Sequence, residues 1–358
     1  MPADGSSVNF NRPPRTPTPT LPDIQVDIPT PPGAVPPPEQ NLLIILLPTI
    51  GIGLITAFYF LRSLDSAAGM VSALPLLALL LFTVGSSLWA QNRRRRDYHV
   101  RREEARIGYV RVLARKQARL QAAQDAYRAI LETNYPAPLE VANVVMTRAQ
   151  ALWQRRPGDP DFLDLRMGTG RVPLPVTINL PDPDTLQAEY DLSFVHAYRS
   201  LEGAPAVTSL KTRSTLGVCG TRSARLSWSR AALLHLAGLH APQELHIYLL
   251  AGQGAHDDWR WLEWLPHTSQ THRGGSADLL AFDDTRTWTA NLSQLIEERR
   301  DRNVQLPHLL IVIDADQLDG ADTITPLIVR EGARAGVTLL YLSASQNLLP
   351  EECSAVVE

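Results

Sequence analysis

Two long apolar blocks stand out early in the chain, ahead of a longer stretch in which apolar runs are short. The blocks cover residues 41 to 61 and 67 to 90, and neither contains a charged side chain. Each is long enough to cross the roughly 30 Å hydrocarbon core of a bilayer as a helix. The segment RSLDS between them leaves room only for a tight turn. The pattern therefore predicts a transmembrane hairpin of two antiparallel helices.

Basic residues decide the predicted orientation of this hairpin. The sequence QNRRRRDYHVRREEAR follows the second block directly, whereas the turn carries only Arg62 together with Asp65. Cytoplasmic flanks of membrane helices are enriched in lysine and arginine. We therefore expect a multi-pass protein of the cell membrane that contacts the lipid bilayer. Its N-terminus and its main domain should both be cytoplasmic.

The segment ahead of the first block is rich in proline. Residues 1 to 40 carry twelve of the chain's 28 prolines. Proline fixes φ and donates no backbone hydrogen bond. The segment is therefore predicted to be a disordered or polyproline-II tail that neither pairs into a sheet nor continues a helix. A docking ligand for a proline-reading partner is the functional alternative.

A basic helix is predicted after the second block. Residues 91 to 135 consist largely of Arg, Ala, Gln, Leu and Glu, which are helix formers. Residues 93 to 119 include eleven basic and three acidic side chains. The helix is either a solvated one held near anionic headgroups or a rigid stalk that contacts copies of itself. Residues 136 to 204 are expected to form a stalk and connecting region.

The remainder alternates between strand-length apolar runs and helical patterns. The runs cover residues 176–180, 206–210, 216–219, 245–251, 309–314 and 337–343, and the helical patterns cover 224–239, 287–302 and 323–335. Such alternation with unbroken apolar strands is typical of a parallel sheet covered on both faces. We predict an α/β domain of the P-loop-NTPase type over residues 205 to 358. We expect it to be incomplete at the C-terminus, with nothing after residue 343 completing the layer.

Charge and cysteine content exclude two classes of protein. The formal net charge of −3 argues against a globally basic nucleic-acid binder. Cys219 and Cys353 are too few for a disulfide framework, so both are interpreted as reduced, buried thiols.

One short stretch, GVCGTRSARLS at residues 217 to 227, lies where a phosphate loop would lie, between a predicted strand and a predicted helix. A phosphate loop has the form G-x-x-x-x-G-K-[ST], in which the lysine and the backbone amides bind phosphate and the hydroxyl holds magnesium. With Gly220 as the first glycine, Ser227 falls on the magnesium-ligand position. Arg225 replaces the second glycine, and Leu226 replaces the lysine.

A second part of the candidate site comes from the run LLIVIDADQL. Asp314 ends this apolar strand, as the aspartate of the magnesium shell does in such enzymes, and Ala315 stands where a catalytic glutamate is expected. Positioned charge at a transferring phosphoryl group contributes several kcal/mol, so its loss should remove most turnover. We thus expect no catalytic residue. The candidate nucleotide-binding residues are Gly220, Thr221, Arg222, Ser223, Arg225, Ser227 and Asp314, with Ser227 and Asp314 as magnesium ligands.

Three outcomes stay open for this loop. The domain could keep the fold without binding nucleotide, it could bind ATP with magnesium weakly, or it could hydrolyse ATP. Weak binding would need Arg222 or Arg225 to supply the missing cation.

Other candidate residues have simpler interpretations. His267 lacks a second ligand at metal-binding spacing, which favours a structural histidine. Trp259, Trp261 and Trp264 are predicted to pack an amphipathic segment against the sheet. Asp316, two residues after the strand, is expected in a solvated turn or helix cap.

Several motifs resemble one protein family. Three stretches resemble type VII secretion ATPases of the EccC/EssC type, within the FtsK/SpoIIIE superfamily. They are LWQRRPGDPDFLDLRMGTG (152–170), GAPAVTSL followed by LGVCG, and DDWRWLEWLPHT (257–268). The resemblance covers residues 40 to 358, including the order of membrane helices, stalk and degenerate domain. It implies a hexamerising motor at the inner face of a membrane secretion pore that exports small helical proteins. Family members continue into further ATPase modules with intact phosphate loops, and the chain contains no such loop.

The resemblance therefore predicts a membrane-anchored component of a type VII-like secretion machine. It would supply the anchor, the stalk and a non-hydrolysing or weakly hydrolysing ATPase-like domain. The expected partners are other subunits of the secretion complex and further copies of the chain, with no nucleic acid. Either the reading frame is truncated or the motor modules lie on a separate chain. The alternative is the N-terminal part of an FtsK/SpoIIIE-like ATP-driven DNA or protein translocase, and a third reading is a scaffold unrelated to secretion.

Overall fold

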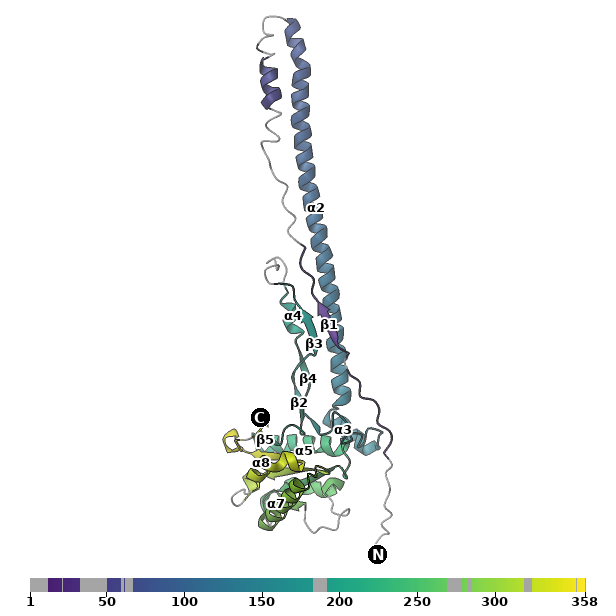
Figure 1. The fold of residues 1–358 in the computed structure, drawn as a ribbon, viewed down its shortest axis with the longest axis vertical. Coiled ribbons are helices and arrows are strands. Elements are labelled where there is room, and N and C mark those ends of the chain that lie inside the picture. The colour runs from purple at the N-terminus through teal and green to yellow at the C-terminus, as the bar shows by residue number, and fades with distance from the viewer. Residues whose placement is uncertain are drawn as a thin grey trace. The chain divides into compact units, whose positions relative to one another are not determined.

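The chain forms two compact units in a computed structural model. The structure describes residues 12–20, 22–32, 50–58, 61, 67–182, 192–268, 279–282, 285–318, 324–351 and 353–357. The first unit comprises Met1–Asp23, Gln124–Pro175 and Arg199–Glu358, and the second comprises Ile24–Ala123 and Val176–Tyr198. Figure 1 shows the elements of both.

A six-stranded sheet forms the centre of the first unit. Its strands are β5 (Thr215–Cys219), β6 (Leu245–Leu250), β7 (Leu280–Ala281), β8 (His308–Asp314), β9 (Val337–Ser343) and β10 (Ala355–Val357). They pair in the order β10-β5-β9-β8-β6-β7, and every pairing is parallel. The predicted parallel sheet is thus confirmed. Because all carboxyl ends share one edge, the residues that follow β5 and β8 come close together there.

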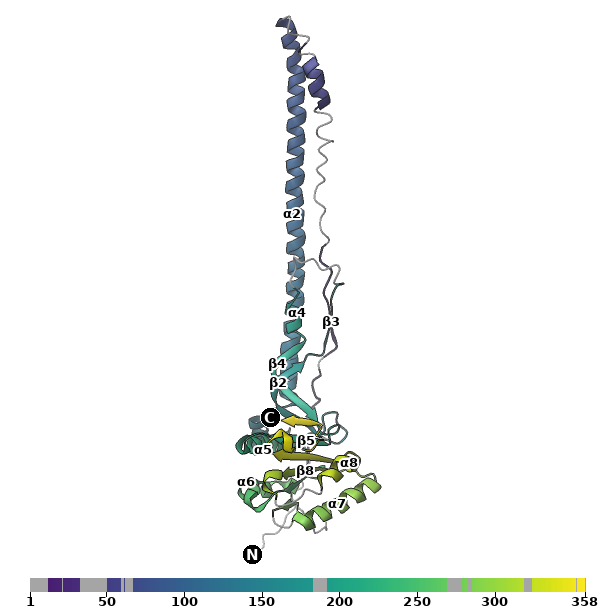
Figure 2. The same cartoon turned by 90° about the vertical axis from the view of Figure 1, so that its left-hand side faces the viewer.

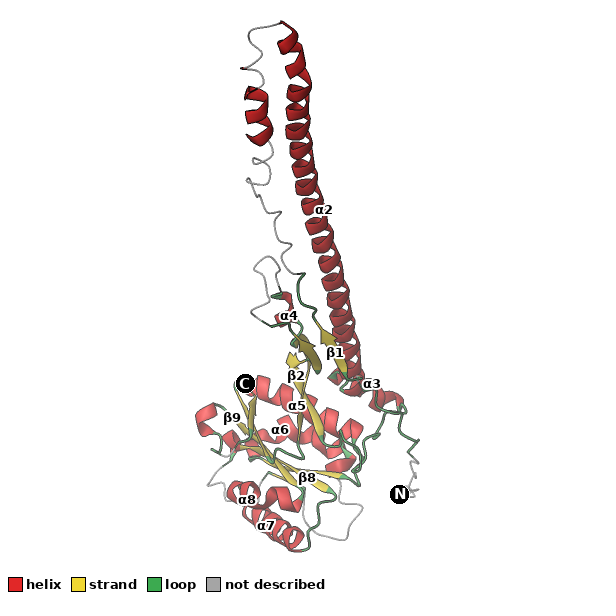
Figure 3. Cartoon of the chain, turned by 45° about the horizontal axis from the view of Figure 1, so that its top comes forward, coloured by secondary structure: helices red, strands yellow, loops and turns green. Residues whose placement is uncertain are grey.

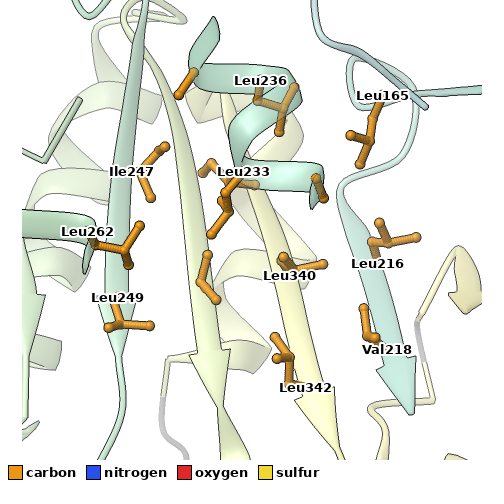
Figure 4. Packing of buried hydrophobic residues seen from close by; sticks show 14 of the residues in the cluster. Leu165, Leu216, Val218, Leu233, Leu236, Ile247, Leu249, Leu262, Leu340 and Leu342 are labelled. Atoms are coloured by element: carbon orange, nitrogen blue, oxygen red, sulfur yellow. The ribbon is translucent and has the colours of Figure 1, made fainter. Parts of the chain in front are cut away.

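Helices cover both faces of this sheet. Helix α5 (Arg222–Leu239) lies on one face, and α7 (Thr285–Asp301) and α8 (Thr325–Ala335) lie on the other (Figures 2 and 3). Alternate residues of β8 serve the two layers: Leu310 and Val312 belong to the α5 cluster, and Ile311 to the opposite cluster. Figure 4 shows the α5 cluster, where Leu233 and Leu236 of the helix pack with side chains of the sheet. Double-sided burial explains why the strands read as unbroken apolar runs.

Residues after the last predicted strand also enter the sheet, so the expectation that nothing beyond Ser343 adds to the layer is wrong. Strand β10 pairs with β5, with Ala355 opposite Leu216 and Val357 opposite Val218. The connection packs against Gly217, where an added Cβ would lie 2.7 Å from Leu349 Cδ1. A three-residue strand is too short to show a period in the sequence.

A two-stranded antiparallel ribbon belongs to the same unit and lies mostly within the predicted connecting region. It joins β2 (Asp164–Pro173) and β4 (Ser200–Ser209), and α3 (Pro138–Thr147) precedes it. Leu131, Leu201 and Ala204 form its small buried cluster.

The second unit is built on helix α2 (Ala67–Asn134), whose last residues, from Gln124, belong to the first unit. The predicted span 67–90 and the predicted stalk 91–135 are therefore consecutive parts of one helix. Strands β1 (Ile24–Asp27) and β3 (Val176–Asn179) pair in parallel, and α4 (Phe194–Ala197) follows. Val26, Ile28, Leu120 and Tyr198 form the buried cluster of this unit.

The predicted transmembrane hairpin is described only in part. Of the first predicted span, the structure describes residues 50–58 and 61. Among the described residues, no helix is both long enough and apolar enough to cross a membrane.

The proline-rich segment departs from its prediction at residues 24 to 27, where the expectation that it pairs into no sheet is wrong. Residues 24 to 27, IQVD, contain no proline, so their amides can pair, and they form β1. Arg12 and Arg15 hold the earlier part through ion pairs with Glu244 and Asp161. Such contacts join residues far apart in sequence and leave no local periodicity.

Buried histidines link the ribbon, α5 and the sheet. His240 accepts a hydrogen bond at Nε2 from the Leu163 amide (3.0 Å), so the proton lies on Nδ1, which donates to the Leu236 carbonyl (2.8 Å). Burial lowers the pKa of His240 to about 3 and that of His267 to about 4. Burial likewise lowers the pKa of His308 to about 3. All three are therefore neutral in the folded protein near neutral pH.

These histidines should make the fold acid-sensitive from about pH 6.5 downward. The unfolded chain takes up protons below the ordinary histidine pKa of 6.5, whereas the folded chain does not until about pH 4 or 3. Between pH 6.5 and 5, each such histidine should lower the free energy of unfolding by about 2 kcal/mol. Urea unfolding of the full chain at both pH values measures this.

His267→Gln should reduce the pH dependence, since glutamine keeps a donor for the His240 carbonyl. His196→Gln, at an exposed position of α4, is the matched control and should leave it unchanged. Equal pH dependence in the wild type and His267→Gln would contradict the prediction.

Candidate functional site at the carboxyl edge of the sheet

A short turn follows β5 at the position of the candidate phosphate loop. Gly220 has φ +124°, which a residue with a Cβ rarely adopts. Thr221 is the N-cap of α5, and its hydroxyl accepts a hydrogen bond from the Ala224 amide at 3.4 Å. Helix α5 begins at Arg222, so only Gly220 and Thr221 connect the strand to the helix.

The remaining predicted loop residues lie inside α5. The first two turns of the helix contain Arg222, Ser223, Arg225 and Ser227. The backbone is already helical there, because the Arg225 amide donates to the Thr221 carbonyl at 3.0 Å. A phosphate loop needs an open run of amides that curves around the phosphate. Once the backbone turns into a helix at Arg222, that run is missing.

The side chains of these helical residues point to different environments. Leu226, at the lysine position of the motif, is 6% exposed and packs in the α5 cluster. Ser227 is exposed in the second turn. Arg225 is 4% exposed at its side chain and forms an ion pair with Asp316. Asp316 is exposed in the turn after β8, as expected, and it also accepts a hydrogen bond from the Ala344 amide (3.0 Å).

Asp314 lies at the end of β8 with only 1% of its side chain exposed. Arg222 approaches it from α5, with Nη2 3.3 Å from Oδ2, and Trp259 donates from Nε1 to the same oxygen at 2.9 Å. The structure thus brings together Arg222 and Asp314, two of the predicted site residues. It joins them through a direct contact of opposite charges.

A second carboxylate completes this arrangement. Asp258 Oδ2 accepts from Arg222 Nη2 at 2.6 Å and from Nε at 3.0 Å. Burial alone would lower the pKa of Arg222, but the hydrogen bonds and charges of Asp258 and Asp314 outweigh it and raise that pKa. The guanidinium is therefore a permanent cation shared by two carboxylates. We name Arg222, Asp258, Asp314 and Trp259 the arginine clamp.

Two members of the clamp were missed from the sequence. Asp258 and Trp259 lie in α6 (His256–Trp259), within the stretch assigned to packing. Trp259 is fully buried, as predicted, but Trp264 is 86% exposed, so the prediction that it packs on the sheet is wrong. In the sequence, only the adjacent Asp258 and Trp259 could have indicated this contact, because a buried indole N–H needs a hydrogen-bond acceptor.

The structural interpretation of His267 is confirmed, because its Nε2 lies 2.8 Å from the His240 carbonyl.

These residues do not fit magnesium and ATP in the manner of a phosphate loop. The carboxylate that would serve the metal is already neutralised by Arg222 and bonded to an indole. Within the described part of the chain, no three His, Cys, Asp or Glu side chains are grouped to hold a metal ion. The geometry supports a fixed internal ion pair.

The fold defines an α/β domain of the nucleotide-binding type. It has a parallel sheet, a glycine turn that enters a helix, and an aspartate at the end of a nearby strand.

The chain matches no family model. It is 35% identical over 271 residues to the ESX-3 secretion system protein EccC3 of Mycobacterium tuberculosis, covering 70% of this chain and 19% of that protein. It is 27% identical over 340 residues to the ESX secretion system protein EccC of Thermomonospora curvata, covering 87% of this chain and 24% of that protein.

The chain belongs to the EccC/EssC family of type VII secretion proteins, and it spans about a fifth to a third of the length of the curated relatives it matches. Among solved structures, it is similar to Thermomonospora curvata EccC (ATPases 2 and 3) in complex with a signal sequence peptide. The identity there is 16% and the TM-score 0.36, over 57% of this chain and 37% of that one.

Removing the clamp arginine should destabilise the first unit. Arg222→Ala leaves the buried Asp314 carboxylate without its cation, which should lower the free energy of unfolding by about 1–3 kcal/mol. Arg230→Ala, an exposed arginine of the same helix that donates to the Asp258 carbonyl, should change it by less than about 0.5 kcal/mol.

A double-mutant cycle isolates the interaction from other effects of the substitution. Asp314→Asn removes the charge that needs Arg222, so Arg222→Ala should cost less in the Asp314→Asn background by about 1 kcal/mol or more. Unfolding free energies from urea titrations provide the measurement. Purely additive effects would show that the two charges are not coupled.

Proposed function

We propose that this chain is a membrane-anchored component of a type VII secretion machine whose nucleotide-fold domain is structural and does not hydrolyse ATP. The observation that carries the proposal is the arginine clamp. Arg222 contacts Asp314 where a metal-bound nucleotide would need the carboxylate free, and the domain supplies this cation itself.

Two further features support loss of hydrolysis. Leu226 is packed in the core where a phosphate-binding lysine would be needed, and Ala315 cannot polarise water. Each positioned group of this kind contributes about 10²–10³ in rate, so their combined absence leaves no fast route to hydrolysis. The domain would instead present a rigid surface to other subunits of the machine. Further copies of this chain and separate motor modules are the partners that the family suggests.

Purified full-length protein should release no phosphate from Mg-ATP above the background of a mock preparation. Asp314→Ala should leave that background unchanged, and fluorescent ATP analogues should bind equally poorly to both proteins. The matched control is Asp301→Ala, an exposed carboxylate at the end of α7. Hydrolysis by the wild type that disappears only in Asp314→Ala would overturn the proposal.

Membrane anchorage is supported by apolar side chains that the described residues leave exposed. More than half of the surface is exposed in each of the apolar residues Ile50, Leu54, Phe58, Leu81, Phe82, Leu88 and Trp89. The Arg93 guanidinium lies 5.4 Å from the centre of the Trp89 ring, just where the basic run begins. Tryptophan and arginine at such a boundary are typical of a membrane–water interface on the cytoplasmic side.

This anchorage predicts the topology of the chain in cells. The protein should leave isolated membranes only with detergent, and reporters fused at the N-terminus or after Ala90 should be active only in their cytoplasmic form. A fusion between residues 62 and 66 should report the opposite side. Deleting the chain from its own cells should abolish export by the type VII machine. A soluble protein, an external signal from either terminus, or unchanged export would contradict the proposal.

A further inference from the structure

The N-terminal segment of residues 12 to 20, which we name the strap, follows a three-residue period. Arg12, Arg15 and Thr18 are half-buried, and Pro13 is the one other strap residue that is not exposed. A polyproline-II helix has three residues per turn and rises 3.1 Å per residue. Side chains three apart therefore lie on one side, about 9 Å from each other. The proline content of RPPRTPTPT matches this conformation.

Both strap arginines form ion pairs with the first unit. Arg12 binds Glu244 through two contacts, Nη2 to Oε1 at 2.6 Å and Nη1 to Oε2 at 3.0 Å, and also donates to the Trp153 carbonyl at 2.9 Å. Arg15 lies 2.5 Å from Asp159 Oδ2 and 2.6 Å from Asp161 Oδ2. These side chains are between 8% and 24% exposed, so solvent screens them less than an ordinary surface pair.

The domain builds the acidic part of this surface without help from the strap. Arg155, which is fully buried, lies 3.2 Å from Asp161 through Nε and donates to the Asp164 and Asn134 carbonyls at 2.6 and 2.8 Å. Burial alone would raise the pKa of Asp161, but Arg15 and Arg155 outweigh it and lower that pKa. The Asp161 carboxylate is thus held in place by Arg155, which does not belong to the strap.

Side-chain donors also contact the strap backbone. Arg156 Nη2 donates to the Pro13 carbonyl (3.3 Å), Gln150 Nε2 to the Pro14 carbonyl (3.3 Å) and Asn134 Nδ2 to the Pro19 carbonyl (3.1 Å). A proline segment offers carbonyl acceptors and few amide donors, so a surface of donors suits it. Acidic groups and donors together match both the side chains and the backbone of the strap.

We propose that this surface is a docking site for a polyproline-II segment with two arginines three residues apart, and that its occupant is the chain's own strap, bound as an exchangeable ligand. The strap contributes no residue to the hydrophobic clusters found among the described residues. Its release therefore breaks ion pairs and hydrogen bonds. Salt weakens such ion pairs, so release is favoured at high ionic strength.

A peptide-binding experiment tests exchange directly. The full-length Arg12→Ala/Arg15→Ala protein keeps the docking site and loses its occupant. By fluorescence anisotropy, a labelled peptide FNRPPRTPTPT should bind this variant at least about tenfold more tightly than the wild type, where the strap competes. The isomer FNRRPPTPTPT, of equal charge and composition, should bind the variant about tenfold more weakly, because its arginines no longer lie on one side. Equal binding of the two peptides, or none to the variant, would overturn the proposal.

Trypsin provides a second measurement that needs no strap substitution. Trypsin cleaves after arginine unless proline follows, so Arg15–Thr16 is the susceptible bond of the strap. Cleavage of the full chain there should accelerate about tenfold in Asp159→Asn/Glu244→Gln, which removes two acidic contacts and spares Asp161. The control Glu202→Gln/Glu351→Gln makes the same charge change at exposed positions of the same unit and should leave the rate unchanged. Equal rates in the two double variants would show that these carboxylates do not hold the strap.

Discussion

Burial of the Asp314 carboxylate is the constraint on which the carboxyl edge of the sheet depends. A charge with 1% exposure is tolerated only with a cation and hydrogen-bond donors around it. Arg222 supplies the cation from the start of α5, and Trp259 supplies a donor from α6. The strand end, the helix start and the α6 segment are consequently fixed to one another by a single charge. The short turn at Gly220 brings the guanidinium within reach.

A similar combination of charges fixes the strap. In both places an arginine is shared by two carboxylates, Asp258 and Asp314 in the clamp and Asp159 and Asp161 under Arg15. The difference lies in burial and connection. The clamp arginine is held in a helix that packs in the core, whereas the strap is an extended segment with no share in the apolar clusters. The first arrangement is permanent, and the second suits an interaction that can be exchanged.

Much of the sheet domain could be predicted from the sequence, because strands buried on both faces read as unbroken apolar runs. Four of the six predicted strand-length runs are strands of the central sheet, and the three helical patterns correspond to α5, α7 and α8. The runs 176–180 and 206–210 are strands too, but they lie outside this sheet, in β3 and β4. Strand β10 could not be predicted, because a segment of three residues is too short to show a hydrophobic period. The strap contacts could not be predicted, because the arginine side chains and proline carbonyls meet their partners only in the folded chain. The clamp depends on where α5 begins, and the motif alignment assumed a loop instead. Thr221 was an available signal, as threonine is a favoured N-cap.

The turn of Gly220 and Thr221 also bears on how such a domain can change in evolution. A phosphate loop differs from this turn in length as well as in residue type, because several loop positions are already wound into α5. Point substitutions in α5 alter side chains while the backbone stays helical, and at Leu226 they would place a charge in the core. A phosphate loop at this place would need inserted residues together with loss of Arg222. The short connection between β5 and α5 therefore puts such a loop beyond the reach of single substitutions.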